Sequence, residues 1–185
     1  LLWIIYKLQE RLRETHIEFC HDDPPPRSFM SLGYLIAPVV VKNIGRTKAT
    51  GCKGELIILE PPYEHFKPIR LSWATGGDQE GSINFARREK AELFVATIKS
   101  TERDRFHICH YAGRDSWTLR ECTIPIESTE WVDYTLKLRI IGDNFDPVEA
   151  ICKLSVKSPI DEPREPLKIE LLQPTSRWKK LLRRK

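Results

Sequence analysis

Several motifs are missing from this sequence, and each absence removes support for one class of function or cellular compartment. The chain has 9 glycines in 185 residues, and none of them forms a GxGxxG or Walker-type loop, so nucleotide binding through a glycine-rich loop has no support. The 5 cysteines are odd in number and include no CxxC pair, which disfavours a secreted disulfide framework. No Asn-x-Ser/Thr glycosylation sequon occurs. The absence of a disulfide pattern and the absence of a sequon are both typical of a protein from a reducing compartment without glycosylation.

The body of the chain also lacks an excess of basic residues. The formal net charge is +4, but six cations lie within residues 177–185. Without them, 24 basic residues stand against 26 acidic ones, so the remainder is close to neutral. A nucleic-acid-binding face on the domain itself is therefore disfavoured. No pair of carboxylates stands out from the ordinary surface charge, so general acid–base catalysis has no support either.

The chain is rich in short apolar runs. An apolar fraction of 41% is enough for a hydrophobic core, and 185 residues suit one domain with extensions. Residues 39–59 set the pattern with a β-branched run, a turn at Asn43 and Gly45, and a second apolar run. We expect the two turn residues to supply positive φ. The second run alternates as a half-buried strand does, with one face small or apolar and the other charged: Cys52, Gly54, Leu56 and Ile58 against Lys53 and Glu55.

The same period of two continues along the chain. Pro38 indicates an edge or a bulge, and the β-branched and aromatic content of residues 91–98 favours a strand over a helix. The clearest alternation flanks a turn at 142–144 and predicts a hairpin with one wet face. We therefore expect strands at 16–20, 34–42, 52–59, 69–73, 82–86, 91–98, 106–111, 117–126, 134–140 and 150–156.

These short strands, with no convincing helix among them, predict an all-β antiparallel β-sandwich over residues 16–157. Trp73 is the candidate core tryptophan. Residues 158–185 are predicted to be a proline-rich linker and a basic tail, in which 167–172 adds a last strand or a short helix. The tail at 177–185 has three open interpretations, namely contact with anionic lipid, contact with nucleic-acid phosphates, or a solubilising end.

Residues 1–15 are predicted to be a hydrophobic, juxtamembrane helix. The run 1–6 is too short to span a bilayer alone, but it has the composition of the end of a transmembrane helix, with Trp3 and Tyr6 at the headgroup level and cations beyond them. This hypothesis places the sandwich on the cytoplasmic side of a membrane. The alternative is an amphipathic helix docked on the domain through Leu1, Ile4, Ile5, Leu8 and Leu12.

The run from Val40 to Cys52, Val-x-Lys-Asn-x-Gly-x-x-x-Ala-x-x-Cys, resembles the second-to-third strand hairpin of immunoglobulin-like domains of the prokaryotic cell-adhesion type. The tyrosine strand and turn at 134–144 are similar to those of membrane-tethered prokaryotic proteins of unassigned function. The resemblance covers about residues 36–157 and implies a fold rather than an activity. The antibody-type Cys–Trp–Cys arrangement is not recognisable, so Cys52 and Cys152 need not form a disulfide.

Three stretches have residues that could do chemistry or bind a metal ion. In His107-Ile108-Cys109-His110, with Cys122 farther along, His107 and Cys109 would share one face of a strand and could reach one ion. That set is incomplete for zinc, and the alternative is a hairpin with one buried thiol and two surface imidazoles. The run Cys20-His21-Asp22-Asp23 places a thiol beside a base, but neighbours on a strand point to opposite faces. The acidic loop 76–81 could hold a cation or be solvated.

The sequence therefore predicts a non-enzymatic interaction module, membrane-associated through its N-terminal helix, that binds a protein partner through loops or an edge strand. No catalytic, cofactor-binding or metal-binding residue is assigned, and neither a cofactor nor a small-molecule substrate is evident. Two other hypotheses remain. One is a metal- or thiol-dependent enzyme that uses the His107–Cys122 region, and the other is a nucleic-acid accessory protein that uses the basic tail.

Overall fold

The computed structural model describes residues 3–4, 15–20, 29–31, 34–61, 68–76, 78, 81–99, 101–102, 104–109, 123–127, 130–157 and 166–172. Apart from the helical residues Trp3 and Ile4, every element assigned in these residues is a β-strand, and every pairing between strands is antiparallel. The strands are β1 (Ile17–Phe19), β2 (Phe29–Ser31), β3 (Tyr34–Asn43), β4 (Ala49–Glu60), β5 (Ile69–Trp73), β6 (Ile83–Phe85), β7 (Lys90–Lys99), β8 (Arg105–Ile108), β9 (Thr123–Pro125), β10 (Val132–Ile141), β11 (Val148–Val156) and β12 (Leu167–Leu172).

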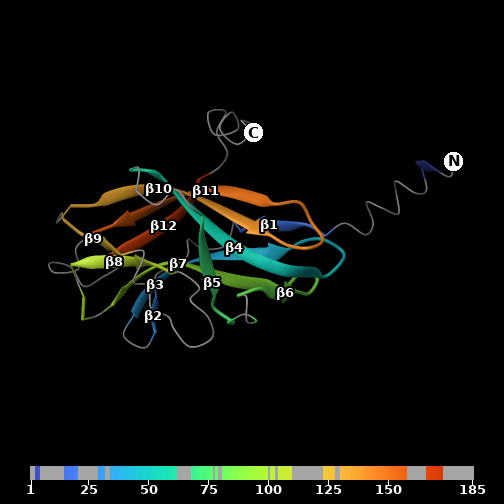
Figure 1. The fold of residues 1–185 in the computed structure, drawn as a ribbon, viewed down its shortest axis with the longest axis horizontal. Helices are drawn as coiled ribbons and strands as arrows, with labels where there is room; N and C mark the ends of the chain where they lie inside the picture. Colours follow the sequence, from blue (N-terminus) through green and yellow to red (C-terminus); the bar gives the residue numbers. More distant parts are fainter. Residues whose placement is uncertain are drawn as a thin grey trace.

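The sheet runs in the order β1-β3-β7-β5-β4-β10-β11-β12. Figure 1 shows two layers, with β10, β11 and β12 above and β3, β7 and β8 below. Strand β5 joins the layers because its two halves have different partners. Ile69–Leu71 pairs with β4, whereas Ser72 and Trp73 pair with β7. A strand that changes partner along its length is a common corner of folded-over sheets.

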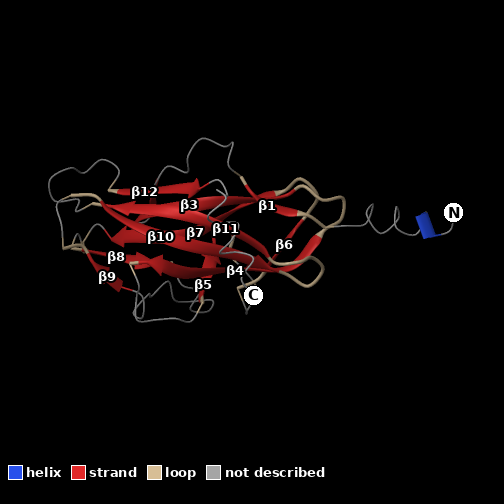
Figure 2. Cartoon of the chain, turned by 90° about the horizontal axis from the view of Figure 1, so that it is seen from above, coloured by secondary structure: helices blue, strands red, loops and turns tan. Residues whose placement is uncertain are grey.

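At the other side the sheet comes close to closing. β12 lies near β3, and β1 lies near β11, but no ladder joins these strands in the described part of the chain. The architecture is therefore an all-β, antiparallel, nearly closed, barrel-like sheet. Figure 2 shows β12 along one margin of it.

Each predicted strand is found where the structure describes its residues, although the ends differ, Cys109 lies just beyond β8, and β2 was not predicted. Every second residue of β5, β10 and β11 faces the core, as the predicted period of two requires, and these residues are all buried: Ile69, Leu71, Trp73, Tyr134, Leu136, Leu138, Ile140, Ala150, Cys152, Leu154 and Val156. Residues 91–98 form a strand, and the register between β3 and β7 shifts at Ala37 and Pro38, so the predicted irregularity at this proline is a bulge. Residues 167–172 form a strand and not a helix.

The turn after β3 differs from its prediction. β3 and β4 do not pair with each other, so residues 44–48 cross between the layers and do not close a hairpin. Asn43 and Gly45 lack positive φ, which in the described residues occurs at Gly51, Gly76, Gly81 and Arg88. The Asn43 side chain shapes the crossing instead. Its Oδ1 accepts from the Gly45 N–H at 3.0 Å, and its Nδ2 donates to the Thr47 carbonyl at 2.8 Å.

The core lies between the layers. Trp73 is 2% exposed, as expected of the core tryptophan, and its indole N–H donates to the carbonyl of Cys52 at 3.2 Å. Its ring meets Phe85 edge-on, with 5.3 Å between centroids. Gly54 allows close approach of the layers because a Cβ there would stand 2.4 Å from Leu93 Cδ1.

The ends of the chain lie largely outside the described residues. This applies to the predicted helix at 1–15, of which Trp3, Ile4 and Thr15 are described, to the linker at 158–165 and to the tail at 177–185. Within the described ranges, no helix has both the length and the hydropathy that a membrane span needs.

Candidate functional site

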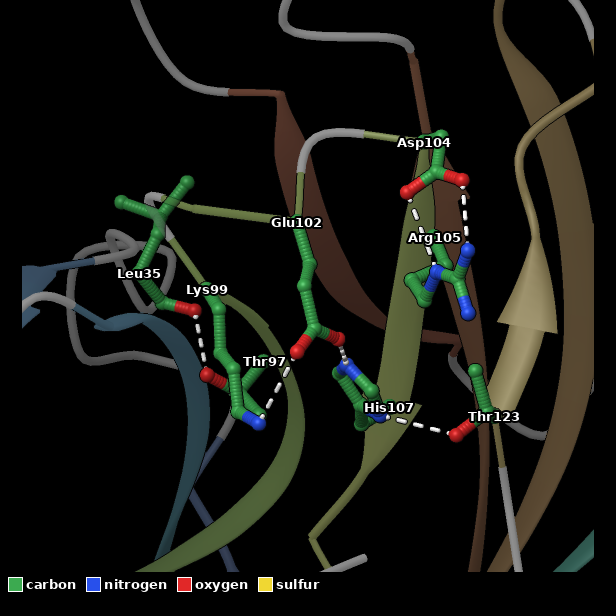
Figure 3. Close-up of polar contacts among 8 residues, drawn as sticks. All are labelled: Leu35, Thr97, Lys99, Glu102, Asp104, Arg105, His107 and Thr123. Carbon is green, nitrogen blue, oxygen red and sulfur yellow. Dashed lines mark hydrogen bonds and ion pairs between the residues drawn. The ribbon is translucent and has the colours of Figure 1, made fainter. Parts of the chain in front are cut away.

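The region of the predicted metal or thiol site contains a chain of polar contacts across three strands, shown in Figure 3. His107 lies on β8 between Thr123 of β9 and Glu102, which follows β7. Its Nδ1 is 3.0 Å from Thr123 Oγ1, and its Nε2 is 3.1 Å from Glu102 Oε2. The other carboxylate oxygen of Glu102 is 3.2 Å from Lys99 Nζ. Three side chains of the segment 99–107 and Thr123 of β9 thus form one chain of contacts.

The protonation of this chain follows from its surroundings. Hydrogen bonding from Lys99, together with the nearby charges of Lys99 and His107, holds the pKa of the Glu102 carboxyl below its ordinary value. Burial lowers the pKa of the His107 imidazole, although Glu102 opposes this effect. At neutral pH the imidazole is therefore neutral. Its Nε2–H donates to the carboxylate, and its Nδ1 accepts from the Thr123 hydroxyl.

Both ring nitrogens of His107 are thus already in use, so the residue has no lone pair free for an ion. A hydroxyl, an imidazole and a carboxylate in series also occur in hydrolases, where they activate a nucleophile that can reach its substrate. Here the series is anchored by β7, β8 and β9, and its imidazole is buried. The geometry favours a polar link that holds the edge hairpin β8–β9 to β7.

Cys109 does not join His107. It packs in a small apolar cluster with Ile36 and Phe94, and its backbone N–H donates to the carbonyl of Val95 at 2.9 Å. Burial raises the pKa of its thiol far above the ordinary value, so the reactive thiolate is disfavoured. The described residues contain no group of three or more histidine, cysteine or acidic side chains arranged to hold a metal ion. His110 and Cys122 lie outside the described residues.

The remaining cysteines of the described ranges are free thiols and not disulfides. Burial raises the pKa of Cys52 to about 12, with the Asp143 charge as a smaller cause, and burial also raises the pKa of Cys152. Cys20 is half-buried at the end of β1, where its N–H donates to the Val40 carbonyl at 3.0 Å. The other residues of that candidate cluster, His21, Asp22 and Asp23, are outside the described residues.

In the acidic loop at 76–81, the Asp78 side chain forms hydrogen bonds within the turn. Asp78 Oδ1 accepts from the Ser82 N–H at 3.0 Å, and Oδ2 is hydrogen-bonded to the Ser82 hydroxyl. Gly76 and Gly81 have φ values of 75° and 71°, which the turn requires. The carboxylate thus closes a turn, and this use accounts for its place in the loop.

The second candidate site is the outer edge of β12. β12 pairs with β11 from Val156↔Leu167 to Ile151↔Leu172. Just beyond the ladder, the N–H of Lys157 donates to the Pro166 carbonyl at 2.9 Å, so this is a hydrogen-bonded pair. Such pairs alternate along an antiparallel ladder. The backbone groups of residues 168, 170 and 172 therefore point to β11, and those of 167, 169 and 171 point away from it.

This edge is the longest that the described residues leave unpaired. The strands with a partner on one side only are β1, β2, β6 and β9, with 3 residues each, and β12, with 6. Leu167 and Ile169 anchor β12 in the core, while Lys168 and Glu170 are exposed. The outer edge of β12 thus carries backbone groups with no ladder partner among the described strands, and it lies near β3, where the sheet comes close to closing.

Sequence reasoning found His107 but missed its partners. Glu102 is five residues away and Thr123 sixteen, and no spacing rule brings them together. The sequence predicts binding through loops or an edge strand, but it does not identify β12 as that strand. Its signal is nevertheless present, because Leu167, Ile169 and Leu171 alternate with Lys168 and Glu170.

Comparisons with known proteins found no relative of this chain. No family model, no curated protein and no solved structure matches the chain.

Proposed function

We propose that this chain is a non-enzymatic interaction module, an immunoglobulin-like domain that binds a protein partner by strand addition at the edge of β12. The observation that carries the proposal is the 6-residue edge whose backbone groups at Leu167, Ile169 and Leu171 point away from β11. Strand addition uses such groups for affinity and the neighbouring side chains for specificity. The antiparallel all-β architecture supports the immunoglobulin-like assignment.

The chemistry of the described side chains supports a binding role over catalysis. His107 is held at both ring nitrogens, and the thiols of Cys52, Cys109 and Cys152 have raised pKa values because they are buried. A nucleophile needs a lowered pKa or a base within reach, and these thiols have neither a lowered pKa nor exposure.

Attachment to a membrane through residues 1–15 belongs to the same proposal. Trp3 and Ile4 are 70% and 57% exposed, so the domain does not cover these apolar side chains. Aromatic and aliphatic side chains of this kind partition into a membrane interface. The test is fractionation of the protein from its own cells. Recovery in a membrane pellet that resists a carbonate wash supports attachment, and recovery in the soluble fraction contradicts it.

The binding role can be tested by crosslinking from the edge. A photoreactive residue replaces Glu170 in the full chain within its own cells, and a matched chain carries it at the exposed Glu92 of β7. We expect a protein adduct from position 170 and not from position 92. We also expect Leu171→Pro to abolish the adduct, because this change removes an outward N–H. Adducts that form equally from both positions, or that persist in Leu171→Pro, would contradict the proposal.

A further inference from the structure

We propose that residues 44–48 and 86–90, at the end of the sheet where β1 begins, form a docking surface for an anionic lipid bilayer. The inference rests on the membrane attachment in the proposed function. It goes further, because it names the face of the domain that meets the bilayer and the charge of the lipid. Figures 1 and 2 show β1 and β6 towards this end of the molecule, and Trp3 and Ile4 lie beyond it.

Backbone hydrogen bonds bring the two segments of this docking surface together. The Arg88 N–H donates to the Asn43 carbonyl at 2.8 Å, and the Asn43 N–H donates to the Glu89 carbonyl at 3.0 Å. The Ile44 N–H donates to the His16 carbonyl at 2.8 Å, so the residue before β1 meets the same place. The two segments, far apart in the sequence, therefore lie side by side next to the point where the chain enters the sheet.

The docking surface is basic. Its cationic side chains are all exposed, and they are Arg46, Lys48, Arg87, Arg88 and Lys90. The two segments contain one carboxylate, that of Glu89, which accepts from the Ala86 N–H at 2.5 Å. Asp143 and Asp146 lie in the connection from β10 to β11, which belongs to the other layer (Figure 1). Clustered lysine and arginine side chains of this kind are attracted to the negative surface of an anionic bilayer.

An exposed apolar side chain lies among these cations. Ile44 is 42% exposed, whereas its neighbours Asn43 and Gly45 are buried. A membrane interface accepts an aliphatic side chain and cations together, because the former enters the acyl boundary while the latter stay at the headgroups. Nucleic-acid phosphates attract the cations but offer no place for the aliphatic side chain. The combination therefore favours a lipid surface over a nucleic acid.

Co-sedimentation of the full chain with vesicles tests the docking surface. The vesicles contain phosphatidylcholine either alone or with about 30% phosphatidylserine, and we expect tighter binding to the anionic ones. R46E/R87E should weaken binding to the anionic vesicles about tenfold or more and leave binding to the neutral ones unchanged. Ile44→Ser should weaken it about threefold or more, because the apolar contact is lost. Arg88 is left in place because its φ of 63° ties it to the turn.

A matched control keeps the effect of net charge apart from the effect of position. K157E/K168E changes the charge by the same amount at the opposite end of the sheet, where β11 ends and β12 begins. Because salt screens charges beyond about 10 Å, this variant should bind within about threefold of the wild type in about 0.1 M salt. Thermal unfolding of each variant checks that the domain is folded.

The outcomes separate this inference from the proposed function. Wild-type affinity in R46E/R87E, or equal weakening in the control, overturns the docking surface. Unchanged vesicle binding in Ile44→Ser, with R46E/R87E losing affinity for a DNA duplex as well, assigns the surface to phosphates and overturns it too. If the docking surface fails while the wild type still resists a carbonate wash, attachment through residues 1–15 stands. A wild type recovered in the soluble fraction that binds anionic vesicles through Arg46 and Arg87 refutes the attachment and keeps the surface.

Discussion

Among single residues, the asparagines show how polar side chains hold the loops in place. The chain has three, and each one binds backbone in a loop or at a strand end. Asn43 is fully buried and bonds to Gly45, Thr47 and Phe85, while Asn144 Oδ1 accepts from the Thr50 N–H at 3.0 Å. Buried backbone groups need such partners, because leaving them unpaired is costly.

Replacing Asn43 with alanine should therefore lower the free energy of unfolding by about 2–3 kcal/mol. The change removes its hydrogen bonds and leaves the Phe85 carbonyl, 3.3 Å from Nδ2, without this donor. Asn84→Ala is the matched control, since it removes an exposed contact to the Gly51 N–H, and it should cost less than about 1 kcal/mol. Urea unfolding of both variants measures the difference. Equal losses would show that the crossing between the layers does not depend on Asn43.

His107 should make stability depend on pH. Burial lowers its folded-state pKa below the unfolded value, so the unfolded state binds a proton more readily. The stabilisation is fully present above the unfolded pKa of about 6.5 and is lost as the pH falls below it. Urea unfolding from pH 7.5 to pH 5 should show this loss, and His107→Gln should reduce it. The exposed His16→Gln variant is the control, and an unchanged slope in His107→Gln would contradict the assignment.

At the scale of elements, the alternation of apolar residues predicts strands well and their partners poorly. The positions and buried faces of β10 and β11 can be predicted from their own sequence, because apolar and polar residues alternate along a half-buried strand. The change of partner within β5 could not be predicted, since it depends on β4 and β7, which lie on either side of it in space. The same reason hides the link from His107 to Thr123. The connection from β3 to β4 was misread because Asn43 and Gly45 fit a hairpin turn equally well.

Gly54 of β4 should not accept a larger side chain without a shift of the residues packed against it. A Cβ would stand 2.4 Å from Leu93 Cδ1, and Leu93 is fully buried and has little room to move. Gly54→Ala is expected to lower the free energy of unfolding by about 1–3 kcal/mol through overpacking. Glu55→Ala, on the outer face of the same strand, should change it by less than about 0.5 kcal/mol. Thermal or urea unfolding that shows a neutral Gly54→Ala would contradict the close contact.

Neighbouring prolines on β12 should have opposite effects on folding and binding. Glu170→Pro removes an N–H that points to β11 and should destabilise the domain by about 1–3 kcal/mol. Leu171→Pro removes an N–H that points outward and should keep the fold while losing the partner. Unfolding measurements and crosslinking from position 170 distinguish the two effects. Loss of folding in Leu171→Pro, with Glu170→Pro tolerated, would reverse the inferred direction of the backbone groups.

For the whole molecule, near-closure of the sheet leaves β12 as the longest strand with a partner on one side only among the described strands. β5 closes one side by joining both layers, and the other side ends in short strands and in β12. Edges invite unwanted pairing, so proteins keep them short or occupy them. The proposed strand addition depends on the 6-residue edge of β12 and its outward backbone groups.

The most direct test is amide hydrogen exchange resolved along β12. In the dilute, dissociated chain, the amides of Leu167, Ile169 and Leu171 should exchange fast, and those of Lys168, Glu170 and Leu172 should be protected by β11. On assembly with the partner, the three fast amides should become protected while the other three change little. Equal protection of all six amides in the dilute chain would show that the edge is already covered, and it would contradict the account.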